Sequence, residues 1–435
     1  MGVDKIKVAI ITHFSNEHIR NRLKLSEYKF DNWIRSLVGQ KSNRFQKDFA
    51  PWITLLIKEF ELRQDVELHI IAPYMGLAKR IEEFEDKGIF YHFFNCDLVS
   101  YYLESLMLLL ERDFMSLNYK KNRTIVKQLV DKIKPDIINL FGAENPYYAC
   151  TVLDIQHIPI ISSCQTVYTN PDREKSERVS RRRWEMEERV FKHVKYFGVF
   201  CGLYDQLIRR TNPNAICFEH KIPSVSFPDI DDVSYEFDFV NFAASHCFKK
   251  GSHDCIRALA IVKKKYPNVT LNIAGGCPLV VKKELQQLIA QFDLNNNVIF
   301  SNYFPNHIDL FYHLKKSRFA VLPVKLDVLS GTITQSMKLG LPLVTNITSG
   351  TILLNKDKEC VLLTEMNDIE GLANNMIKLM DSQNLAALLR KNAREYYDKN
   401  FDNAKIVEQL VLIYKAIIKH NEEGDKISDE LLFHL

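Results

Sequence analysis

The sequence has no C-x-x-C pair and no grouping of cysteine and histidine at zinc-site spacing, although it contains nine cysteines. An odd number of scattered cysteines favours reduced thiols in a cytosolic chain, because disulfide frameworks use even numbers at regular spacings. The sequence therefore predicts neither a structural metal site nor a disulfide framework.

Long apolar runs are also missing. Leu106–Leu110 is the longest, and Glu104 interrupts the apolar stretch before it, so it falls well short of the roughly 20 residues that a spanning helix needs. The first residues, Met1–Lys5, lead into a β-like run and lack the apolar stretch of a signal peptide. We expect a cytoplasmic protein that is attached at most to the inner surface of a membrane.

Glycine, proline and an excess of one charge are all scarce. With 15 Gly, 14 Pro and no low-complexity tract, the composition is that of an ordinary soluble globular protein. The net charge of +4, from 58 basic and 54 acidic residues, is too small to indicate nucleic-acid binding. A length of 435 residues exceeds what one hydrophobic core supports, so we expect two domains.

Short apolar runs alternate with amphipathic, helix-length stretches along the chain, a pattern typical of parallel sheets with crossover helices. In the first half the predicted strands are 8–11, 68–71, 89–93, 137–140, 158–163 and 197–200. In the second half they are 239–242, 269–273, 298–300, 319–322, 343–345 and 360–363. The two sets predict an α/β protein with two doubly wound domains.

A linker is predicted over 227–236, which carries Pro228 and an acidic run without helical or strand periodicity. We place the N-terminal domain at 1–232 and the C-terminal domain at 233–435, with the last helices free to return to the N-terminal domain. Two doubly wound domains can direct the carboxyl ends of their strands toward one crevice, so we expect ligands in a central cleft.

The segment 319–342 carries the most chemical information and has the pattern strand, loop, helix, turn. Ser330 and Gly331 form a tight loop before the helix, so backbone N–H groups at the helix start can meet an anionic diphosphate. Gln335 then falls in the first turns. The alternative is a plain connection between a strand and a helix, which is common in α/β proteins.

This segment resembles the signature of the GT-B glycosyltransferases of family 4, in which two Glu residues are separated by seven positions. Asp327 and Gln335 occupy the two Glu positions, and Met337, Gly340 and Pro342 follow at the family's spacing. The resemblance implies a GT-B fold with two Rossmann-like domains and the transfer of a sugar from a nucleotide-diphosphate donor.

Other segments of the C-terminal half are similar to the same family. Residues 242–251 resemble its strand, loop and Lys-Gly segment, in which Lys250 matches the lysine that contacts the donor diphosphate. Residues 273–276 resemble its strand-end glycine turn, with Gly276 at the end. The N-terminal half matches less, since 12–16 replace the usual glycine pair after the first strand.

The resemblance implies a retaining transfer without a metal or other cofactor. Lys250 and the helix start at Ser330, Gly331 and Thr332 would hold the diphosphate. Asp327 would orient the sugar, and Gln335 would hold the ribose through its carbonyl. Leaving-group charge would be stabilised by fixed donors rather than by a cation.

Two positions depart from the family pattern besides Asp327 and Gln335. Ser245, a predicted donor-site residue, stands where the family has an Arg, with His246 beside it. A lone His near a strand end is more often structural than functional, although His246 or Lys249 could supply the lost charge. Gln165 stands where the family often has a His, and we expect it to position a sugar hydroxyl because it cannot act as a base.

The acceptor implied by the resemblance is a glycan or a lipid-linked saccharide, as in polysaccharide biosynthesis. A cluster of cations is either a solvated helix face or a contact for an anionic lipid-linked acceptor or membrane surface; its members are Lys175, Arg178, Arg181, Arg182 and Arg183. The rival functions are a catalytically silent GT-B binding or regulatory protein, favoured by the departures above, and a nucleotide-sugar epimerase on the same architecture.

Overall fold

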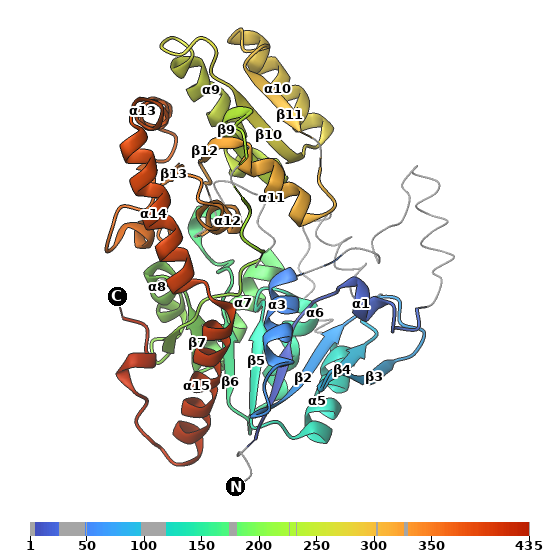
Figure 1. Cartoon of the computed structure of the whole chain (residues 1–435). Helices are drawn as coiled ribbons and strands as arrows, with labels where there is room; N and C mark the ends of the chain where they lie inside the picture. The colour runs from blue at the N-terminus through green and yellow to red at the C-terminus, as the bar shows by residue number, and fades with distance from the viewer. Residues whose placement is uncertain are drawn as a thin grey trace. The chain divides into compact units, whose positions relative to one another are not determined.

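The chain folds into two compact units, which Figure 1 draws in a computed structural model. The first comprises Met1–Pro223 and Asn403–Leu435, and the second comprises Ser224–Asp402. The structure describes residues 5–25, 48, 50–96, 119–173, 181–225, 227–231, 233–301, 303–325 and 329–434. The predicted boundary at 232 therefore falls inside the second unit, and Asp232 itself lies outside the described residues.

An eight-stranded sheet forms the first unit, in the order β3-β4-β2-β1-β5-β6-β7-β8. The strands are β1 Ile6–Ile11, β2 Val66–Pro73, β3 Ile81–Asp86, β4 Ile89–Phe94, β5 Ile137–Phe141, β6 Ile160–Ser163, β7 Tyr196–Val199 and β8 Ile216–Glu219. All neighbours are parallel except β3, which pairs antiparallel with β4. Every residue of β5 is buried, as expected for a parallel strand covered on both faces.

All six strands predicted for the first half are present in this sheet. The prediction missed β3 and β8. β3 lies at the sheet edge and has two apolar residues among four acidic ones, with the sequence IEEFED, so the search for continuous apolar runs could not find it. β8, with the sequence ICFE, begins with an apolar run as long as the predicted strand 298–300 and offered the same signal.

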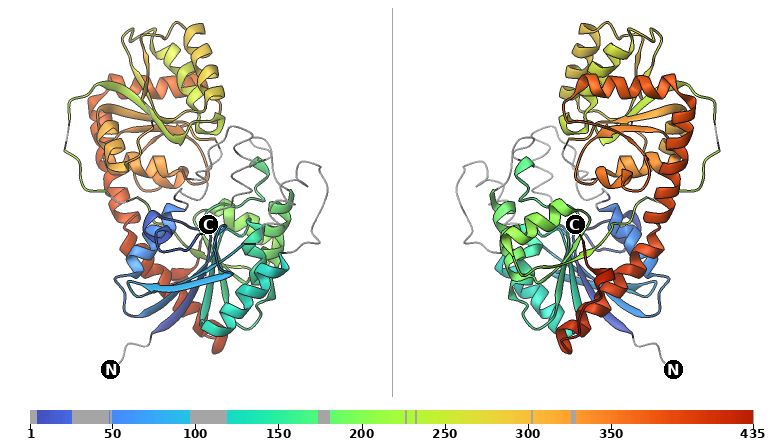
Figure 2. Two further views of the ribbon diagram at one scale, coloured as in Figure 1. Left: turned by 90° about the vertical axis from the view of Figure 1, so that its right-hand side faces the viewer. Right: turned by 90° about the vertical axis from the view of Figure 1, so that its left-hand side faces the viewer.

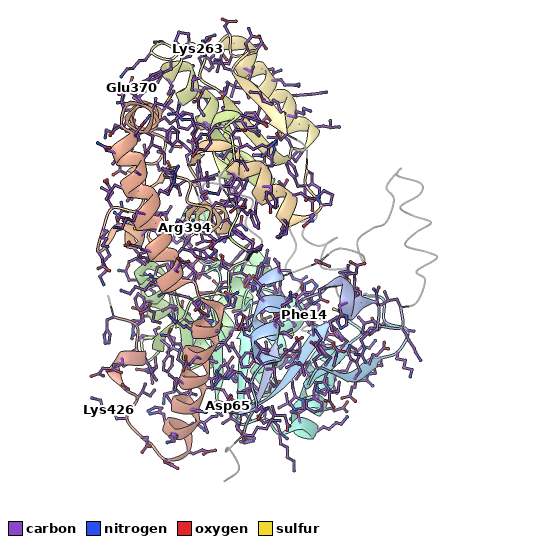
Figure 3. The ribbon with its side chains drawn as sticks, in the orientation of Figure 1. Phe14, Asp65, Lys263, Glu370, Arg394 and Lys426 are labelled. Atoms are coloured by element: carbon purple, nitrogen blue, oxygen red, sulfur yellow. The ribbon has the colours of Figure 1, made fainter. Side chains whose placement is uncertain are left out.

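The helices of the first unit are α1 Glu17–Arg20, α3 Pro51–Phe60, α5 Lys120–Ile133, α6 Pro146–Ala149, α7 Arg181–His193, α8 Gly202–Thr211 and α15 Asn403–Glu422. Helix α15 comes from the far end of the chain and lies beside α3 and the sheet (Figure 1). It is tied there by Lys415 Nζ, which lies 3.2 Å from an oxygen of Asp65, a residue labelled beside the helix in Figure 3.

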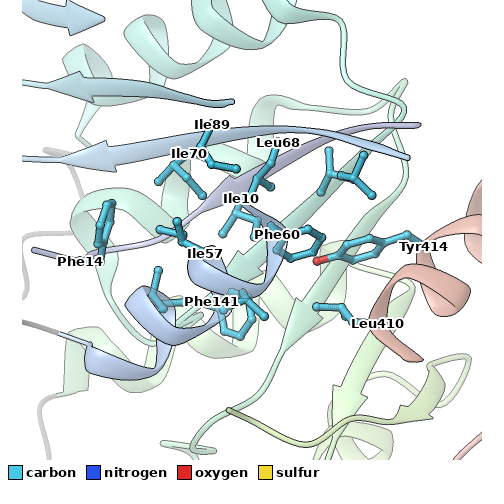
Figure 4. Close-up of a cluster of buried hydrophobic side chains, with 14 of the residues drawn as sticks. Ile10, Phe14, Ile57, Phe60, Leu68, Ile70, Ile89, Phe141, Leu410 and Tyr414 are labelled. Carbon is cyan, nitrogen blue, oxygen red and sulfur yellow. The ribbon is translucent and has the colours of Figure 1, made fainter. Parts of the chain in front are cut away.

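Apolar side chains of α15 complete the core of the first unit. Tyr414 and Leu410 extend a cluster formed by Ile10 of β1, Leu68 of β2 and Phe60 of α3 (Figure 4). The one polar atom of the fully buried Tyr414, its hydroxyl, accepts a hydrogen bond of 2.7 Å from Asn139 Nδ2. The carboxyl-terminal helix is therefore an integral part of the first unit.

A six-stranded parallel sheet forms the second unit, in the order β11-β10-β9-β12-β13-β14. The strands are β9 Phe237–Ser245, β10 Leu271–Gly276, β11 Val298–Ser301, β12 Ser317–Leu322, β13 Leu343–Asn346 and β14 Leu362–Thr364. All six strands predicted for the second half are therefore confirmed, and the doubly wound α/β fold class with them.

Helices cover both faces of this second sheet, as Figure 2 shows. They are α9 Ser252–Val262, α10 Leu279–Gln291, α11 His307–Lys315, α12 Gly331–Leu339, α13 Ile369–Asp381 and α14 Gln383–Asn400. One core cluster contains apolar residues of α9, α10 and α13, and the other contains residues of α11 and α12. Two cores on opposite faces of one sheet are the defining feature of a doubly wound domain.

The predicted linker 227–236 has no regular structure where it is described, up to the start of β9, but it is not a free connection. Phe227 and Ile230 are buried in the second core of the C-terminal unit, and the ring of Phe227 packs at 3.9 Å on that of Phe311. The polar composition of the segment hid these two anchors, so the prediction placed the boundary too far along the chain.

Two negative findings apply to the described residues. None of the helices found there combines the length and the apolar character that crossing a bilayer requires. Within the same residues, no three side chains of the His, Cys, Asp and Glu types are grouped so as to bind a metal ion.

We predict that Tyr414→Phe destabilises the first unit by about 1–3 kcal/mol, because it leaves the buried Asn139 amide without its acceptor while the ring packing is preserved. Urea unfolding followed by circular dichroism measures the change. Tyr312→Phe is the matched control, since Tyr312 is 49% exposed. Equal stabilities for the two variants would contradict an anchoring role of this hydrogen bond.

Candidate functional site

The carboxyl edge of the second sheet brings together most of the residues predicted to bind the donor. β9 ends at Ser245 and β10 ends at Gly276, and these two residues are partners in the strand register. After β12 the chain reaches α12, which starts at Gly331. Because the strands are parallel, these three ends meet at one edge, where α/β proteins bind their ligands.

The glycine turn at the end of β10 allows the two central strands to approach closely. Gly275 has a φ of +116°, and a Cβ atom there would overlap the carbonyl oxygen of Ala243. A Cβ on Gly276 would likewise collide with the carbonyl of Ala244. The Gly276 carbonyl accepts a 2.7 Å hydrogen bond from the backbone N–H of His246. The two glycines therefore let β10 pack closely against β9 at the predicted turn 273–276.

Lys250 lies in a one-turn 3-10 helix, Phe248–Lys250, that directly follows β9 and a short turn. Gly251 ends it with a φ of +75°, and a Cβ there would collide with the Pro323 backbone, so the turn lies flat against the end of β12. Lys250 Nζ is 3.4 Å from Ser330 Oγ. Residues 80 positions apart in the chain therefore meet at the helix start.

The start of α12 offers backbone N–H groups to an anion. Ser330 is the N-cap residue, but its side chain makes no capping hydrogen bond; its hydroxyl instead contacts Thr332 Oγ1 at 3.0 Å. Gly331 is exposed, and a Cβ there would meet open space. Uncapped N–H groups and the positive end of the helix dipole make such a position suitable for a diphosphate.

Of the other residues that the sequence predicts to bind the donor, the structure describes Gln335 and Ser245 but not Asp327. Gln335 lies half-buried in α12, one turn after the helix start. Asp327, predicted to orient the sugar, lies outside the described residues, as do its neighbours at 326 and 328. Ser245 is exposed at the end of β9. The structure therefore joins Ser245, Gly276 and the group around Lys250 on one edge.

Sequence reasoning missed Lys325, the charged residue that organises this edge. Lys325 Nζ lies 2.7 Å from Asp254 Oδ2, and both side chains are almost fully buried. It also lies 4.1 Å from the centre of the Phe248 ring, and its backbone N–H donates to the Lys249 carbonyl at 3.0 Å. A lysine directly after an apolar strand was the available signal.

Gln165, the residue predicted to position a sugar hydroxyl, belongs to the first unit. It is exposed and follows β6 at the carboxyl edge of that sheet. His13 follows β1 in the same unit, and its Nδ1 lies 2.7 Å from the hydroxyl of Tyr147. Burial lowers the pKa of His13 to about 4, so this imidazole is neutral at physiological pH.

Glu187 of α7 is a second functional candidate that sequence reasoning missed. Its carboxylate is fully buried and accepts the backbone N–H groups of Tyr168 at 2.8 Å and Thr169 at 2.6 Å. Burial raises its pKa to about 7, with a smaller contribution from Glu144. The carboxylate thereby fixes the loop that carries Gln165.

The predicted solvated face of α7 is only partly correct. Arg181 is exposed and pairs with Glu185 one turn on. Arg182, however, is buried, and Arg183 lies over the Tyr168 ring and contacts Glu144. Arg183 can be partly buried because its long stem and planar head pack beside an aromatic and an acidic partner. Lys175 and Arg178 lie outside the described residues.

The buried Glu187 predicts a pH dependence of stability. Because burial raises its pKa above the value in the unfolded chain, the folded protein binds more protons between about pH 4.5 and 7, so stability falls as pH rises through that window. Glu187→Gln should remove a slope worth at most about 3 kcal/mol.

Urea unfolding at pH 5, 6, 7 and 8 measures this slope. Glu85→Gln, which changes an exposed carboxylate of the same unit, should leave it unchanged. A wild-type slope that survives in Glu187→Gln would show that other groups carry the titration.

Comparison with known proteins agrees with this geometry. Residues 236–396 match the family model described as glycosyl transferases group 1. CapM, a capsular polysaccharide biosynthesis glycosyltransferase of Staphylococcus aureus, is 22% identical over 178 residues, which are 40% of this chain and 44% of CapM. The chain thus matches less than half of the length of this curated relative.

Two solved structures are similar over nearly the whole chain. Sucrose-phosphate synthase from Thermosynechococcus elongatus has a TM-score of 0.65 at 13% identity, covering 94% of this chain and 98% of the synthase. HepE from Anabaena, in complex with UDP and glucose, has a TM-score of 0.60 at 14% identity, covering 94% and 99%. The predicted architecture is thereby confirmed: the chain has the GT-B fold, and its segment 236–396 matches the glycosyl transferases group 1 family.

Proposed function

We propose that this protein is a retaining glycosyltransferase of family 4 that moves a sugar from a nucleotide-diphosphate donor to a glycan or lipid-linked saccharide. The observation that carries the proposal is the meeting of Lys250 with the uncapped start of α12, within the segment that matches the group 1 family. A lysine and free helix N–H groups are the donors that a diphosphate leaving group requires.

Each residue then has a defined role. Lys250 and the N–H groups from Gly331 onward bind the diphosphate and stabilise the charge that develops on it when the glycosidic bond breaks. Gln335 accepts a hydrogen bond from a ribose hydroxyl. Asp327 orients the donor sugar, and Gln165 of the first unit positions a sugar hydroxyl.

The relatives suggest which ligands to test first. HepE is solved with UDP and glucose, and CapM acts in capsular polysaccharide biosynthesis, which supports a UDP-sugar donor and a polysaccharide-type acceptor. We expect turnover without added divalent cation, because Lys250 and the helix start supply the positive potential at the diphosphate. Activity that depends on Mg²⁺ or Mn²⁺ would contradict this assignment of charge.

We predict that Lys250→Ala weakens the binding of a nucleotide sugar by about 10- to 100-fold, the loss expected for one charge-assisted hydrogen-bonding group. A thermal-shift screen against UDP-, GDP-, ADP- and CMP-linked sugars identifies the donor, and calorimetry measures its affinity. Lys283→Ala, on an exposed position of α10, is the matched control.

The screen, followed by analysis of the products, separates the rival functions. A chain that responds to no nucleotide sugar would be a silent GT-B binding protein, and the proposal would be wrong. A chain that binds a donor and releases an isomerised nucleotide sugar, without transfer, would be an epimerase.

A second prediction concerns Gln335, whose neutral amide replaces a carboxylate of the family signature. Gln335→Ala should lose one hydrogen bond to the ribose and weaken donor binding by roughly 3- to 10-fold. Gln335→Glu should bind at least as tightly as the wild type, because a charged acceptor makes the stronger bond. The comparison requires a 2′,3′-dideoxy nucleotide as control, whose affinity should not change; an equal loss with that ligand would exclude the ribose as partner.

A further inference from the structure

His246 is a buried histidine at the carboxyl edge of the second sheet, where the donor is proposed to bind. The proposed function assigns this histidine no role. It directly follows Ser245 at the end of β9 and is 0% exposed. Its Nε2 lies 3.0 Å from the carbonyl oxygen of Ala274 in β10, and its Nδ1 lies 2.8 Å from Ser252 Oγ at the first residue of α9. Both ring nitrogens therefore have a close polar partner.

The contacts continue from Ser252 across the sheet. Ser252 Oγ lies 2.8 Å from Oδ1 of Asn241, and Nδ2 of the same amide lies 2.8 Å from the carbonyl oxygen of Val321 in β12. Asn241 and Ser252 are buried like His246. The result is a chain of polar contacts that joins β10, α9, β9 and β12 and ends on a backbone carbonyl at each side.

This chain has one hydrogen too few when His246 is neutral. Each of its four contacts requires one hydrogen, and the terminal carbonyls of Ala274 and Val321 can only accept. A neutral imidazole supplies one hydrogen, the Ser252 hydroxyl one, and the Asn241 amide one along this path. Changing the tautomer of the ring or turning the amide only moves the unmade bond to another contact. An imidazolium supplies the missing hydrogen and completes all four.

The free protein nevertheless favours the neutral ring. Burial lowers the pKa of His246, against a smaller opposing effect of the hydrogen bond to the Ala274 carbonyl. The positive end of the α9 dipole, at Ser252, also disfavours a cation. The surrounding elements also carry other titratable groups: Cys247, Lys249, Lys250, Cys255 and Cys277, the pair His253 and Glu284, and Asp254 with its partners Lys325 and Arg257. An added negative charge at this edge would shift the balance toward imidazolium.

We propose that His246 is a positioning residue that takes up one proton when the donor diphosphate binds at the turn carrying Ser245 and Lys250. The inference rests on the proposed function. The proton comes from solvent and adds to Nδ1, while Nε2–H keeps its bond to Ala274. The new N–H donates to Ser252 Oγ, and the Ser252 hydroxyl is then free to donate to Asn241.

The proton gives the buried His246 ring a positive charge, which replaces the charge that Ser245 does not provide. The completed contacts also fix the end of β9 against β10, β12 and the start of α9, which are the elements that frame Lys250. Binding and protonation are linked, so donor affinity should rise as pH falls between the pKa of His246 in the donor-bound protein and its lower pKa in the free protein. Outside that window His246 should cause no change of affinity with pH.

Calorimetry with UDP-glucose as the probe tests the inference. One of its phosphates is esterified to ribose and the other to glucose, so the ligand itself gains or loses no proton near neutral pH. Binding is measured in two buffers of different ionisation enthalpy at each pH from 6 to 8. The wild type should take up as much as one proton per UDP-glucose bound, and its affinity should fall by up to tenfold per pH unit between the pKa values of His246 in the free and the donor-bound protein.

Three variants identify the group that takes up the proton. His246→Gln keeps a donor for the Ala274 carbonyl but cannot titrate, so it should show no uptake and a flat pH profile. Ser252→Ala removes the acceptor for Nδ1–H and should reduce the uptake. His307→Gln, which changes an exposed histidine of α11 in the same unit, should retain the wild-type uptake.

The possible failures are distinguishable. Wild-type binding of UDP-glucose without proton uptake would overturn the inference and leave the proposed function intact, and so would equal uptake by His246→Gln. If His246→Gln does not fold, ¹⁵N-histidine NMR of the wild type decides, because the inference requires a neutral Nε2–H ring that becomes doubly protonated on addition of UDP-glucose. Failure of every nucleotide sugar to bind would overturn the proposed function and this inference together.

Discussion

The buried ion pair between Lys325 and Asp254 is the interaction on which the carboxyl edge of the second sheet depends. A charge pair removed from water is costly unless its geometry is good and its remaining donors are satisfied. Here Lys325 meets three partners, because Asn367 accepts a further hydrogen bond of 2.8 Å and the Phe248 ring lies over the ammonium group. This satisfied ammonium joins the end of β12 to the start of α9 and to the turn before it.

The contacts of Lys325 also fix the position of Lys250. The turn that carries it is fixed by the hydrogen bond from the Lys325 backbone to Lys249 and by the close approach of Gly251 to Pro323, and His246 before it contacts Ser252 after it. The helix start at Ser330 is reached by the loop that leaves the same strand end. A flexible lysine side chain is therefore presented by a rigid frame, and a small loss of packing at Asp254 would displace the site without touching it.

The sequence was sufficient to predict what depends on apolar periodicity. All twelve predicted strands are present, because fully buried parallel strands read as continuous apolar runs. It could not predict the edge strand β3, whose outer face is acidic, or the anchors Phe227 and Ile230 within a polar segment. Nor could it find Glu187, because a buried carboxylate and a solvated one look alike in a charged helix until the backbone N–H groups that it accepts are in place.

The departures from the family signature leave the net charge of the four signature positions unchanged, although the charged residues are fewer. By resemblance the family places an Arg, a Lys and two Glu around the donor, which sum to zero. Here Ser245, Lys250, Asp327 and Gln335 also sum to zero, because a cation and an anion are lost together. In the proposed donor site, the potential that attracts a diphosphate then comes from Lys250 and the N–H groups at the start of α12, and from His246 once it is protonated, in place of the arginine. Such groups need little reorganisation when the ligand arrives, so the paired losses are compatible with an active site.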